Sequence, residues 1–371
     1  MKIGILGCGV ISNTYIQEIK RLYQPLLEIA AVAGRNTEST RAAAEKYEIP
    51  AAYTVDELLA DPEIELVVNL TPPCAHVELN RRILEADKHL FCEKPFALSV
   101  EDAKELAALA EKKGLLIGAA PDTFLTAPMQ SCRKLLEEGW IGKPLYATAN
   151  MMSCGVETWH PSPQAFYQQG GGPLFDMAPY YLSVLIHLFG PVQEVFSYGA
   201  KGYEERRIYS QPLAGTSVKV EIPTHYTSVL KMKNGVLVNM NMSFDIWHST
   251  LPKLELYGTE GTMTMPDPNM SDGRPCVFRK EQVLAGCYGL TADAKSYELP
   301  LRNQSVSAYT RGCGVAEMAL AIRDGRKNRA NEQMAIHIVE VINRIMESAG
   351  MGRCCRIESE CAQPGLWEQV W

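Results

Sequence analysis

The sequence predicts an α/β protein in which a doubly wound parallel sheet is followed by an α+β domain with an open, mostly antiparallel sheet. A glycine-rich turn joins an apolar run to a helical pattern at the N-terminus. Strand and helix patterns then alternate over residues 1–120, whereas residues 192–265 have the pattern of successive strands and turns. A chain of 371 residues is long enough for two domains, and we expect the boundary after residue 121.

The composition excludes several classes of function. Hydrophobic residues make up 46% of the chain and charged residues 21%, and the net charge of −7 comes without a basic run, so we expect no nucleic-acid or membrane partner. No apolar run is long enough to span a membrane, and an apolar strand beginning at residue 2 leaves no room for a signal peptide. The eleven cysteines show no zinc-ligand spacing, so we expect reduced thiols, a cytoplasmic protein and no metal.

The N-terminal turn has the pattern of a dinucleotide-binding βαβ unit. A strand over Lys2–Leu6 is followed by the glycines Gly7 and Gly9 and by a helix that ends near Tyr23. Gly7 permits a tight turn, Gly9 lets the backbone approach a pyrophosphate, and the helix N-terminus attracts that anion. Ser12 replaces the third glycine of G-x-G-x-x-G, and a purely structural turn is the alternative. The cofactor contacts expected here are Gly7, Gly9, Val10 and Ile11.

The patterns that follow predict a parallel sheet buried on both faces, because continuous apolar runs alternate with helical segments. The expected strands span residues 29–33, 64–70, 89–92 and 115–119, and the expected helices span 37–47, 75–86 and 100–113, with another helix opening at the capping box of residues 54–57. Ligands of doubly wound sheets bind beyond the carboxyl ends of the strands. We therefore place around one crevice the residues that follow these ends: Gly34-Arg35, Thr71-Pro72-Pro73 and Glu93-Lys94-Pro95.

The second domain is expected to combine helices with a series of strands. A loop from Ser153 to Gly172 precedes a helix that begins with Pro173 at its first position and ends near Phe189. Lys233-Asn234-Gly235 predicts a hairpin turn. The further expected elements are helices at 128–138, 314–323 and 332–348, strands at 145–151, 218–222, 226–232, 236–242, 253–257 and 262–265, and a loop from residue 350.

The residues after the second strand bear on the choice of cofactor. NAD binders usually carry an acidic residue there, which accepts a hydrogen bond from the ribose 2′-hydroxyl. Here Gly34 is followed by Arg35, so no carboxylate repels a 2′-phosphate and a guanidinium is available to bind it. We expect NADP rather than NAD, with an ordinary surface arginine as the alternative.

Several side chains are candidates for chemistry, and each has a structural alternative. Lys94 at a strand end can stabilise a developing alkoxide, or can simply be solvated. Asp176 and Tyr180 share one helix face, with Asp176 expected in the first turn; alternatively they are a helix-end carboxylate and a core tyrosine. His76 can reach the cofactor or bind backbone groups, and His160 can line a substrate pocket or lie on the surface.

Together these residues resemble the Gfo/Idh/MocA family of oxidoreductases over nearly the whole chain. The most specific mark is Glu93-Lys94-Pro95 at this distance from the N-terminal turn. The other marks are Gly7-Cys8-Gly9, Thr71-Pro72-Pro73 with His76, Gly170-Gly171-Gly172 with Asp176, and Gly258-Thr259-Glu260-Gly261. The resemblance implies a dinucleotide-binding Rossmann domain in residues 1–121 and a substrate-binding and oligomerisation domain in residues 122–371. It also implies hydride transfer at a secondary alcohol or hemiacetal of a sugar, polyol or related compound.

The resemblance also assigns catalytic residues. The family lysine corresponds to Lys94 and the family aspartate to Asp176. Many members have histidine four residues after the aspartate, whereas Tyr180 stands here, as in members of the glucose–fructose oxidoreductase and dihydrodiol dehydrogenase type. A phenol can serve as the acid–base group if a nearby cation lowers its pKa from about 10. The catalytic residues implied are therefore Lys94, Asp176 and Tyr180.

These arguments lead to one set of expected sites and partners. The cofactor, NADP with NAD as the alternative, is expected to contact Gly7, Gly9, Val10, Ile11, Arg35, Thr71, Pro72, His76, Glu93 and Lys94. A carbohydrate-like substrate is expected to contact Lys94, Trp159, His160, Asp176 and Tyr180. We expect a homodimer or homotetramer. Two alternative functions are a glycoside-processing enzyme that oxidises a sugar transiently with a tightly bound nicotinamide, and a non-catalytic regulator that binds a dinucleotide.

Overall fold

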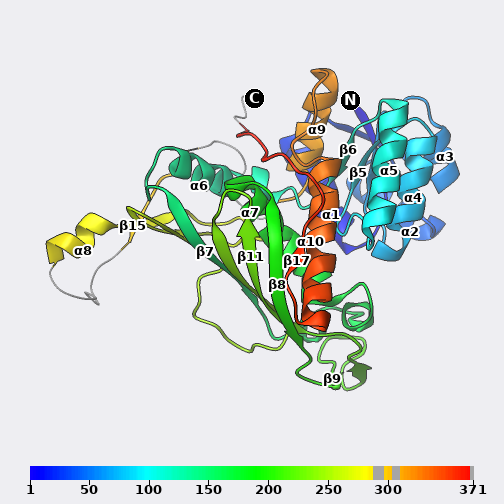
Figure 1. The fold of residues 1–371 in the computed structure, drawn as a ribbon. Coiled ribbons are helices and arrows are strands. Elements are labelled where there is room, and N and C mark those ends of the chain that lie inside the picture. The colour runs from blue at the N-terminus through cyan, green and yellow to red at the C-terminus, as the bar shows by residue number, and fades with distance from the viewer. Residues whose placement is uncertain (287–295, 303–309, 368–371) are drawn as a thin grey trace. The chain divides into compact units, whose positions relative to one another are not determined.

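The computed structural model describes residues 1–286, 296–302 and 310–367 and divides into two compact units (Figure 1). The first unit comprises Met1–Leu125 and Thr310–Val339. The second comprises the described residues of Thr126–Tyr309 and Glu340–Trp371. None of the helices described is long and apolar enough to cross a bilayer.

The first unit is built on a parallel sheet, as the sequence predicts, but with six strands where the sequence analysis expects five. Its strands are ordered β3-β2-β1-β4-β5-β6, and every neighbouring pair is parallel. The strands are β1 (Lys2–Leu6), β2 (Glu28–Ala33), β3 (Ala51–Tyr53), β4 (Leu66–Asn69), β5 (His89–Cys92) and β6 (Ile117–Ala119). The strand order reverses between β1 and β4, and doubly wound sheets bind their ligands at such a switch point.

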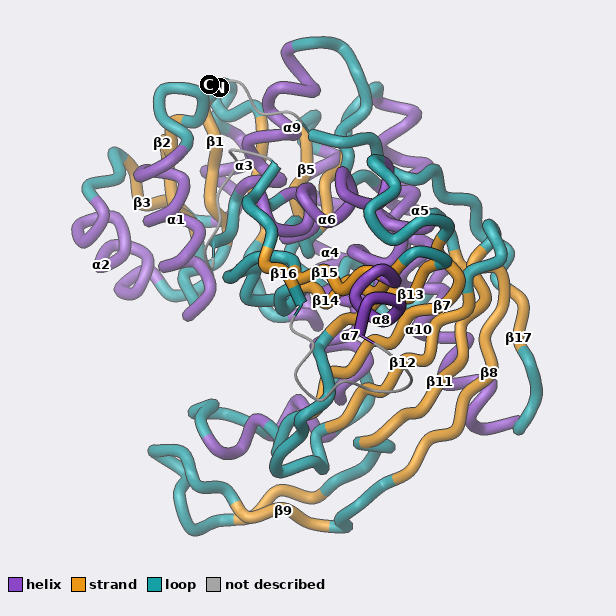
Figure 2. Tube along the Cα trace, turned by 90° about the vertical axis from the view of Figure 1, so that its left-hand side faces the viewer, coloured by secondary structure: helices purple, strands orange, loops and turns teal. Residues whose placement is uncertain are grey.

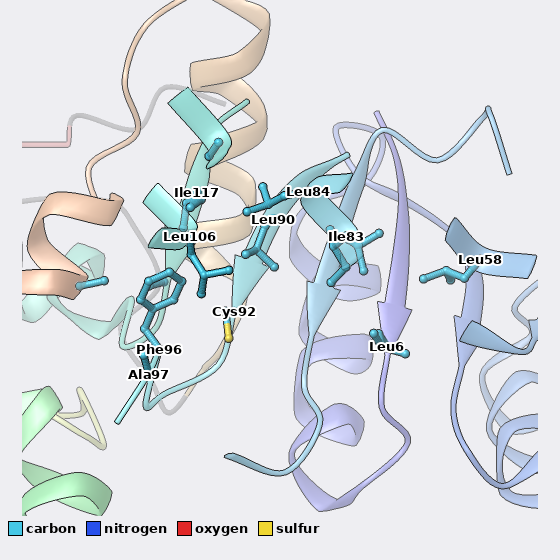
Figure 3. Packing of buried hydrophobic residues seen from close by; sticks show 14 of the residues in the cluster. Leu6, Leu58, Ile83, Leu84, Leu90, Cys92, Phe96, Ala97, Leu106 and Ile117 are labelled. Atoms are coloured by element: carbon cyan, nitrogen blue, oxygen red, sulfur yellow. The ribbon is translucent and has the colours of Figure 1, made fainter. Parts of the chain in front are cut away.

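Helices separate successive strands of this sheet: α1 (Val10–Leu22), α2 (Thr37–Tyr47), α3 (Val55–Ala60), α4 (His76–Glu85) and α5 (Val100–Lys113). The core between helices and sheet includes Leu6, Ile83, Leu90 and Leu106, each no more than 1% exposed (Figure 3). All four residues of β4 are buried, which explains why this strand is a continuous apolar run apart from its last residue. The strand β3, which the sequence analysis missed, is only three residues long and half-exposed.

A segment distant in sequence completes the first unit. It contains α9 (Cys313–Arg323) and the start of α10 (Glu332–Met351). Asp122 Oδ2 accepts hydrogen bonds from Gly312 N at 3.0 Å and Gly314 N at 2.8 Å, and Asn328 Nδ2 donates to the Ile117 carbonyl oxygen at 3.0 Å. The limits predicted from the sequence, 1–121 and 122–371, assign this segment to the other domain and therefore differ from the compact units. Local patterns carry no signal for contacts between residues so far apart in the chain.

The second unit is built on a nine-stranded sheet with the order β16-β15-β14-β13-β7-β12-β11-β8-β17 (Figure 2). Neighbouring strands are antiparallel except for the parallel pair of β7 and β12, so the predicted mostly antiparallel sheet is confirmed. The strands are β7 (Pro144–Met152), β8 (Val192–Ala200), β11 (His225–Met232), β12 (Leu237–Ser243), β13 (Leu254–Gly258), β14 (Gly261–Met265), β15 (Cys276–Arg279), β16 (Tyr297–Glu298) and β17 (Cys355–Arg356). β17 lies in the tail that the sequence predicts as loop.

Further elements of this unit, besides the later part of α10, lie outside the main sheet. They are α6 (Ala127–Glu137), α7 (Gly172–Phe189), α8 (Lys280–Gly286) and a separate two-stranded sheet of β9 (Glu205–Arg207) and β10 (Ser217–Lys219). The strand expected at 218–222 is thus shorter and pairs outside the main sheet. The predicted hairpin between β11 and β12 is confirmed, and Gly235 in its turn has φ +93°. The helix α7 packs against β7 and β12, so one face of the main sheet is covered by the helix that carries Asp176 and Tyr180.

Candidate functional site

The turn between β1 and α1 has the geometry of an anion-binding cradle. Gly7 has φ +108°, and a Cβ there would lie 2.8 Å from the Leu70 carbonyl group, so only glycine fits. A Cβ on Gly9 would meet nothing within 4 Å, which leaves this backbone open to a ligand. Gly9 is the N-cap of α1 without a side-chain cap, and Ser12 Oγ donates to the Gly9 carbonyl oxygen at 2.6 Å. Backbone N–H groups at such a helix start can bind an oxygen anion.

The positions beside this turn include several of the predicted cofactor contacts. Val10 is 77% exposed at the first position of α1. After β2, a Cβ on Gly34 would come within 2.9 Å of Thr40 Oγ1, so a carboxylate side chain there would require its neighbour to shift. Arg35 follows with an exposed side chain. The strand end therefore presents a guanidinium where NAD binders usually present an acid.

His76 joins the loops that follow β4 and β5. Its side chain is 1% exposed, with Nε2 at 2.7 Å from the Thr71 carbonyl oxygen and Nδ1 at 2.7 Å from the Pro95 carbonyl oxygen. Carbonyl oxygens only accept hydrogen bonds, so both ring nitrogens donate and the ring is an imidazolium. Burial lowers the pKa of His76, but Cys92 and the two carbonyl hydrogen bonds raise it by more, to about 9. His76 thus binds backbone groups, and its contact with a cofactor stays a prediction.

Glu93 links the glycine turn to the loop that carries Lys94. It is 6% exposed, and its two carboxylate oxygens accept from Tyr15 Oη at 2.9 Å and from Lys94 N at 2.8 Å. Tyr15 belongs to α1, the helix that starts at the glycine turn. The backbone of Lys94 is therefore fixed relative to α1. Sequence reasoning missed Tyr15, because no local signal connects residues 78 positions apart.

The helix α7 positions Asp176 and Tyr180 in the second unit. It begins at Gly172, one residue before the predicted start, so Asp176 lies in the second turn and its expected place in the first turn is wrong. Gly172 has φ +77°, a backbone conformation that favours glycine, at the junction between the loop and the helix. Asp176 is half-buried and Tyr180 is 5% exposed; four residues apart, they share a helix face. Pro179 lies inside this helix and cannot donate a backbone hydrogen bond.

The loop before α7 carries two predicted substrate residues. Trp159 is 65% exposed, and its ring lies edge-on to that of His160 with centroids 5.3 Å apart. Ser162 N donates to His160 Nδ1 at 3.0 Å, so the neutral ring carries its proton on Nε2. Burial lowers the pKa of His160 below 6.5, against smaller opposing effects of the Ser162 hydrogen bond and the Asp176 carboxylate. His160 and Asp176 thus interact electrostatically within the second unit.

The structure therefore gathers the predicted residues in two groups. The first unit holds the expected cofactor residues, which lie at the carboxyl ends of its parallel strands. The second unit holds Trp159, His160, Asp176 and Tyr180. The cooperation of Lys94 with Asp176 and Tyr180 stays a prediction. Among the residues that the structure describes, no group of three or more His, Cys, Asp or Glu side chains is arranged to hold a metal ion.

We predict that replacing His76 by glutamine destabilises the first unit most at and below neutral pH. The folded-state pKa of about 9 exceeds the ordinary 6.5, so the stabilisation by the imidazolium is complete below pH 6.5 and is lost as the pH rises through 9. The shift corresponds to roughly 3 kcal/mol. The free energy of unfolding can be measured in urea at about pH 6 and about pH 10. The difference in this free energy between wild type and variant should be smaller by this amount at the higher pH. His225→Gln on β11 is the control, and a difference independent of pH would contradict the imidazolium.

Comparison with known proteins agrees with this architecture. Residues 1–120 match an oxidoreductase family with an NAD-binding Rossmann fold, and residues 129–264 match the GFO/IDH/MocA C-terminal domain. A trans-1,2-dihydrobenzene-1,2-diol dehydrogenase of Bos taurus is 24% identical over 341 residues, which cover 92% of each chain. An uncharacterized oxidoreductase of Schizosaccharomyces pombe is 31% identical over 196 residues, 51% of this chain and 52% of the relative.

Solved structures share the fold over nearly the whole chain. An NAD binding oxidoreductase from Klebsiella pneumoniae has a TM-score of 0.80 at 20% identity, with coverage of 97% of this chain and 99% of that one. Levoglucosan dehydrogenase in complex with NADH and L-sorbose has a TM-score of 0.78 at 18% identity, with the same coverage. The two family matches include the glycine turn, the Lys94 loop and α7. The chain belongs to the Gfo/Idh/MocA family of NAD-binding oxidoreductases.

Proposed function

We propose that this protein is an NADP-preferring oxidoreductase that transfers hydride between nicotinamide and a secondary alcohol or hemiacetal of a sugar, polyol or related compound. The observation that carries the proposal is the anchored loop of Lys94, whose backbone Glu93 and His76 hold at the carboxyl edge of the parallel sheet. A protein that only binds a dinucleotide needs no lysine there. Family membership supports the reaction class. The similarity to a levoglucosan dehydrogenase solved with L-sorbose supports a carbohydrate-like substrate.

The cofactor is proposed to lie along the carboxyl edge of the parallel sheet. The turn of Gly7 and Gly9 and the start of α1 would hold the pyrophosphate, with the exposed Val10 and its neighbour Ile11 beside it. Arg35 would bind a 2′-phosphate on the adenosine ribose. The loops after β4 and β5 would hold the nicotinamide end through the remaining expected contacts, Thr71, Pro72, Glu93 and Lys94, with His76 fixing both loops. The bound nicotinamide would supply the hydride acceptor or donor.

Side chains of both units are proposed to carry the proton chemistry. Hydride leaving the substrate carbon must be matched by a proton leaving its oxygen, and Tyr180 is proposed to accept that proton. Lys94 is proposed to stabilise both the phenolate and the developing alkoxide. Asp176, one helical turn from Tyr180, would orient the substrate hydroxyl or the Lys94 ammonium. Trp159 and His160 would line the rest of the substrate site, with the Nε2–H of His160 as a donor to a substrate oxygen.

The two alternative functions would give different results in an activity assay. A glycoside-processing enzyme would retain its nicotinamide through purification and turn over without added cofactor. A non-catalytic regulator would bind dinucleotide and show no turnover with any sugar or polyol. The absorbance of reduced nicotinamide in a screen of sugars and polyols, with and without added NADP, therefore tests the proposal against both.

The first test of this proposal concerns the choice of cofactor. Arg35→Ala should weaken NADP binding by about ten- to a hundredfold and leave NAD binding nearly unchanged, because a charge-assisted hydrogen bond to phosphate contributes roughly 1.5–3 kcal/mol. Fluorescence titration of both cofactors measures this. Arg41→Ala, which removes another exposed arginine on α2, is the control. Equal losses for the two cofactors, or a wild type that prefers NAD, would overturn the preference.

The second test concerns the acid–base group. Tyr180→Phe should lower kcat by about 10²–10⁴, the usual contribution of general acid–base catalysis, and Lys94→Ala should lower it at least as much. Both variants should bind NADP almost normally, because the pyrophosphate site lies at the glycine turn. Tyr181→Phe makes the same chemical change one residue further along α7 and serves as the control. If Tyr180→Phe keeps the wild-type kcat at every pH, tyrosine is not the acid–base group and His160 becomes the next candidate.

The main sheet of the second unit offers a surface for self-association. On the face away from α7, Tyr146 is in register with Leu237, and Phe196 with Val229. The exposed fractions are 55% for Tyr146, 40% for Leu237, 45% for Val229 and 64% for Tyr198 on β8. Lys231 and Asn239 stand in register with Leu237 and Val229 on the same face, so exposed apolar side chains alternate there with polar ones. Exposed apolar side chains gathered on one sheet face favour an interface. We propose a homodimer or homotetramer formed through this face, with more than roughly 1,200 Å² buried in total.

Placing a charge on this face should break the assembly. Val229→Glu should reduce the mass measured by light scattering at micromolar concentration, because the new carboxylate would be buried without a partner. Leu251→Glu alters an exposed leucine in a loop outside the sheet and should leave the mass unchanged. A wild type that is already monomeric would refute the proposed assembly.

A further inference from the structure

A buried cluster of charges holds the loop that precedes α7. Arg206 of β9 donates from Nε to Glu157 Oε1 at 2.7 Å and from Nη1 to Asp245 Oδ1 at 2.6 Å. Its Nη2 donates to the carbonyl oxygens of Cys154 at 2.5 Å and Phe244 at 3.0 Å. The side chains of Arg206 and Glu157 are only 5% and 3% exposed. One guanidinium therefore joins three segments that are distant in sequence.

The remaining carboxylate oxygens in the cluster are also satisfied. Tyr167 Oη donates to Glu157 Oε2, and Thr224 Oγ1 donates to Asp245 Oδ2 at 2.7 Å. Gly155 has φ +96°, and a Cβ there would clash with the Glu157 carboxylate and the Tyr167 hydroxyl. The loop backbone is thus packed directly on the ionic cluster. A fully hydrogen-bonded buried network favours one arrangement of the segments that it joins.

The same segments hold the backbone of His160. The Glu157 carbonyl oxygen accepts from Tyr209 N at 3.0 Å and from Ser210 N at 3.2 Å. Ser210 Oγ donates to the His160 carbonyl oxygen at 2.5 Å, and His160 N donates to the Val156 carbonyl oxygen at 2.8 Å. The segment after β9 is therefore hydrogen-bonded to the loop at Glu157 and at His160. Both contacts depend on β9, which Arg206 attaches to the loop.

We propose that Arg206 is a positioning residue for substrate binding, which acts by fixing Glu157 and through it the place of His160 and Trp159. The proposal rests on the proposed function of those two residues in the substrate site. An arginine is needed because its planar fork reaches four acceptors in fixed directions, whereas the ammonium of lysine is a single point of charge. Sequence reasoning gave Arg206 no role.

The test compares Arg206→Lys with Arg207→Lys. Arg207 is the next residue of β9 and is exposed, so the same change there is a matched control. Arg206→Lys should raise KM for the best substrate by at least about tenfold with kcat changed less than about threefold, because the site is displaced while the chemistry remains. The affinity for NADP should be unchanged. In a His160→Ala background the effect of Arg206→Lys on KM should be smaller than in the wild type, since the part that acts through His160 is then absent.

A second readout does not depend on activity. The imidazole of His160 can be followed by NMR of labelled histidine, with its signal assigned by His160→Ala. In the wild type its pKa should lie below 6.5, mainly because the ring is partly buried. In Arg206→Lys the pKa should move back toward 6.5 as the released ring gains water. Arg207→Lys should leave it in place.

The two measurements distinguish a failure of the proposed function from a failure of the positioning role of Arg206. If the wild type turns over no sugar or polyol, the proposed function fails, while the NMR measurement still decides whether Arg206 positions His160. An unchanged His160 signal in Arg206→Lys, or a rise in KM of equal size in the His160→Ala background, would overturn the positioning role. Should Arg206→Lys fail to fold, Ser210→Ala removes the hydrogen bond to His160 without touching the ion cluster, and the same shift of the His160 signal is expected.

Discussion

The close approach of Gly7 to the end of β4 is the constraint on which the carboxyl edge of the first unit depends. The strands β1 and β4 pair up to their carboxyl ends, where Leu70 N donates to the Leu6 carbonyl oxygen at 2.8 Å, and only a glycine at position 7 leaves room for this close approach. Hydrogen bonds then connect α1 to the loop that follows β5. Tyr15 on α1 binds Glu93, and Glu93 binds the backbone of Lys94. Hydrogen bonds therefore connect the helix that follows the glycine turn to the backbone of Lys94 in another loop.

The elements that the sequence predicts well are those whose signals are local. The capping box at Thr54 and Glu57 forms both of its reciprocal hydrogen bonds, because its donors and acceptors lie within one helical turn. The parallel strands other than β3 are recognisable because burial on both faces demands continuous apolar runs. The two-residue strand β17 has no such signal, since it exists only through its pairing with β8. The start of α7 differs from the predicted one by a single residue, because a residue pattern defines a helix end only to within one or two residues.

In the candidate site, too, the residues with a local sequence signal are predicted, whereas those that depend on contacts distant in sequence are not. Lys94 and His76 follow strands that the apolar runs predict, and the topology of a parallel sheet places such residues at one edge. Arg206 and Arg207 look alike in sequence, yet one is buried among carboxylates and the other is exposed. The partners of Arg206 lie 39 and 49 residues away, and no periodic pattern links them to it. The residues proposed to react are thus visible in the sequence, whereas those that hold them in place are not.

The return of residues 310–339 to the first unit has a consequence for biosynthesis. The carboxylate of Asp122 accepts hydrogen bonds from Gly312 and Gly314, and these partners are made 190 and 192 residues later. Residues 1–125 therefore leave the ribosome well before the segment that covers the end of β6 exists. The parallel sheet can form early, but the segment that packs on its last strand is translated only after all the described strands of the second unit except β17. Folding of the two units is consequently interleaved in time, and in a nascent chain shorter than about 310 residues Asp122 still lacks the backbone donors of Gly312 and Gly314.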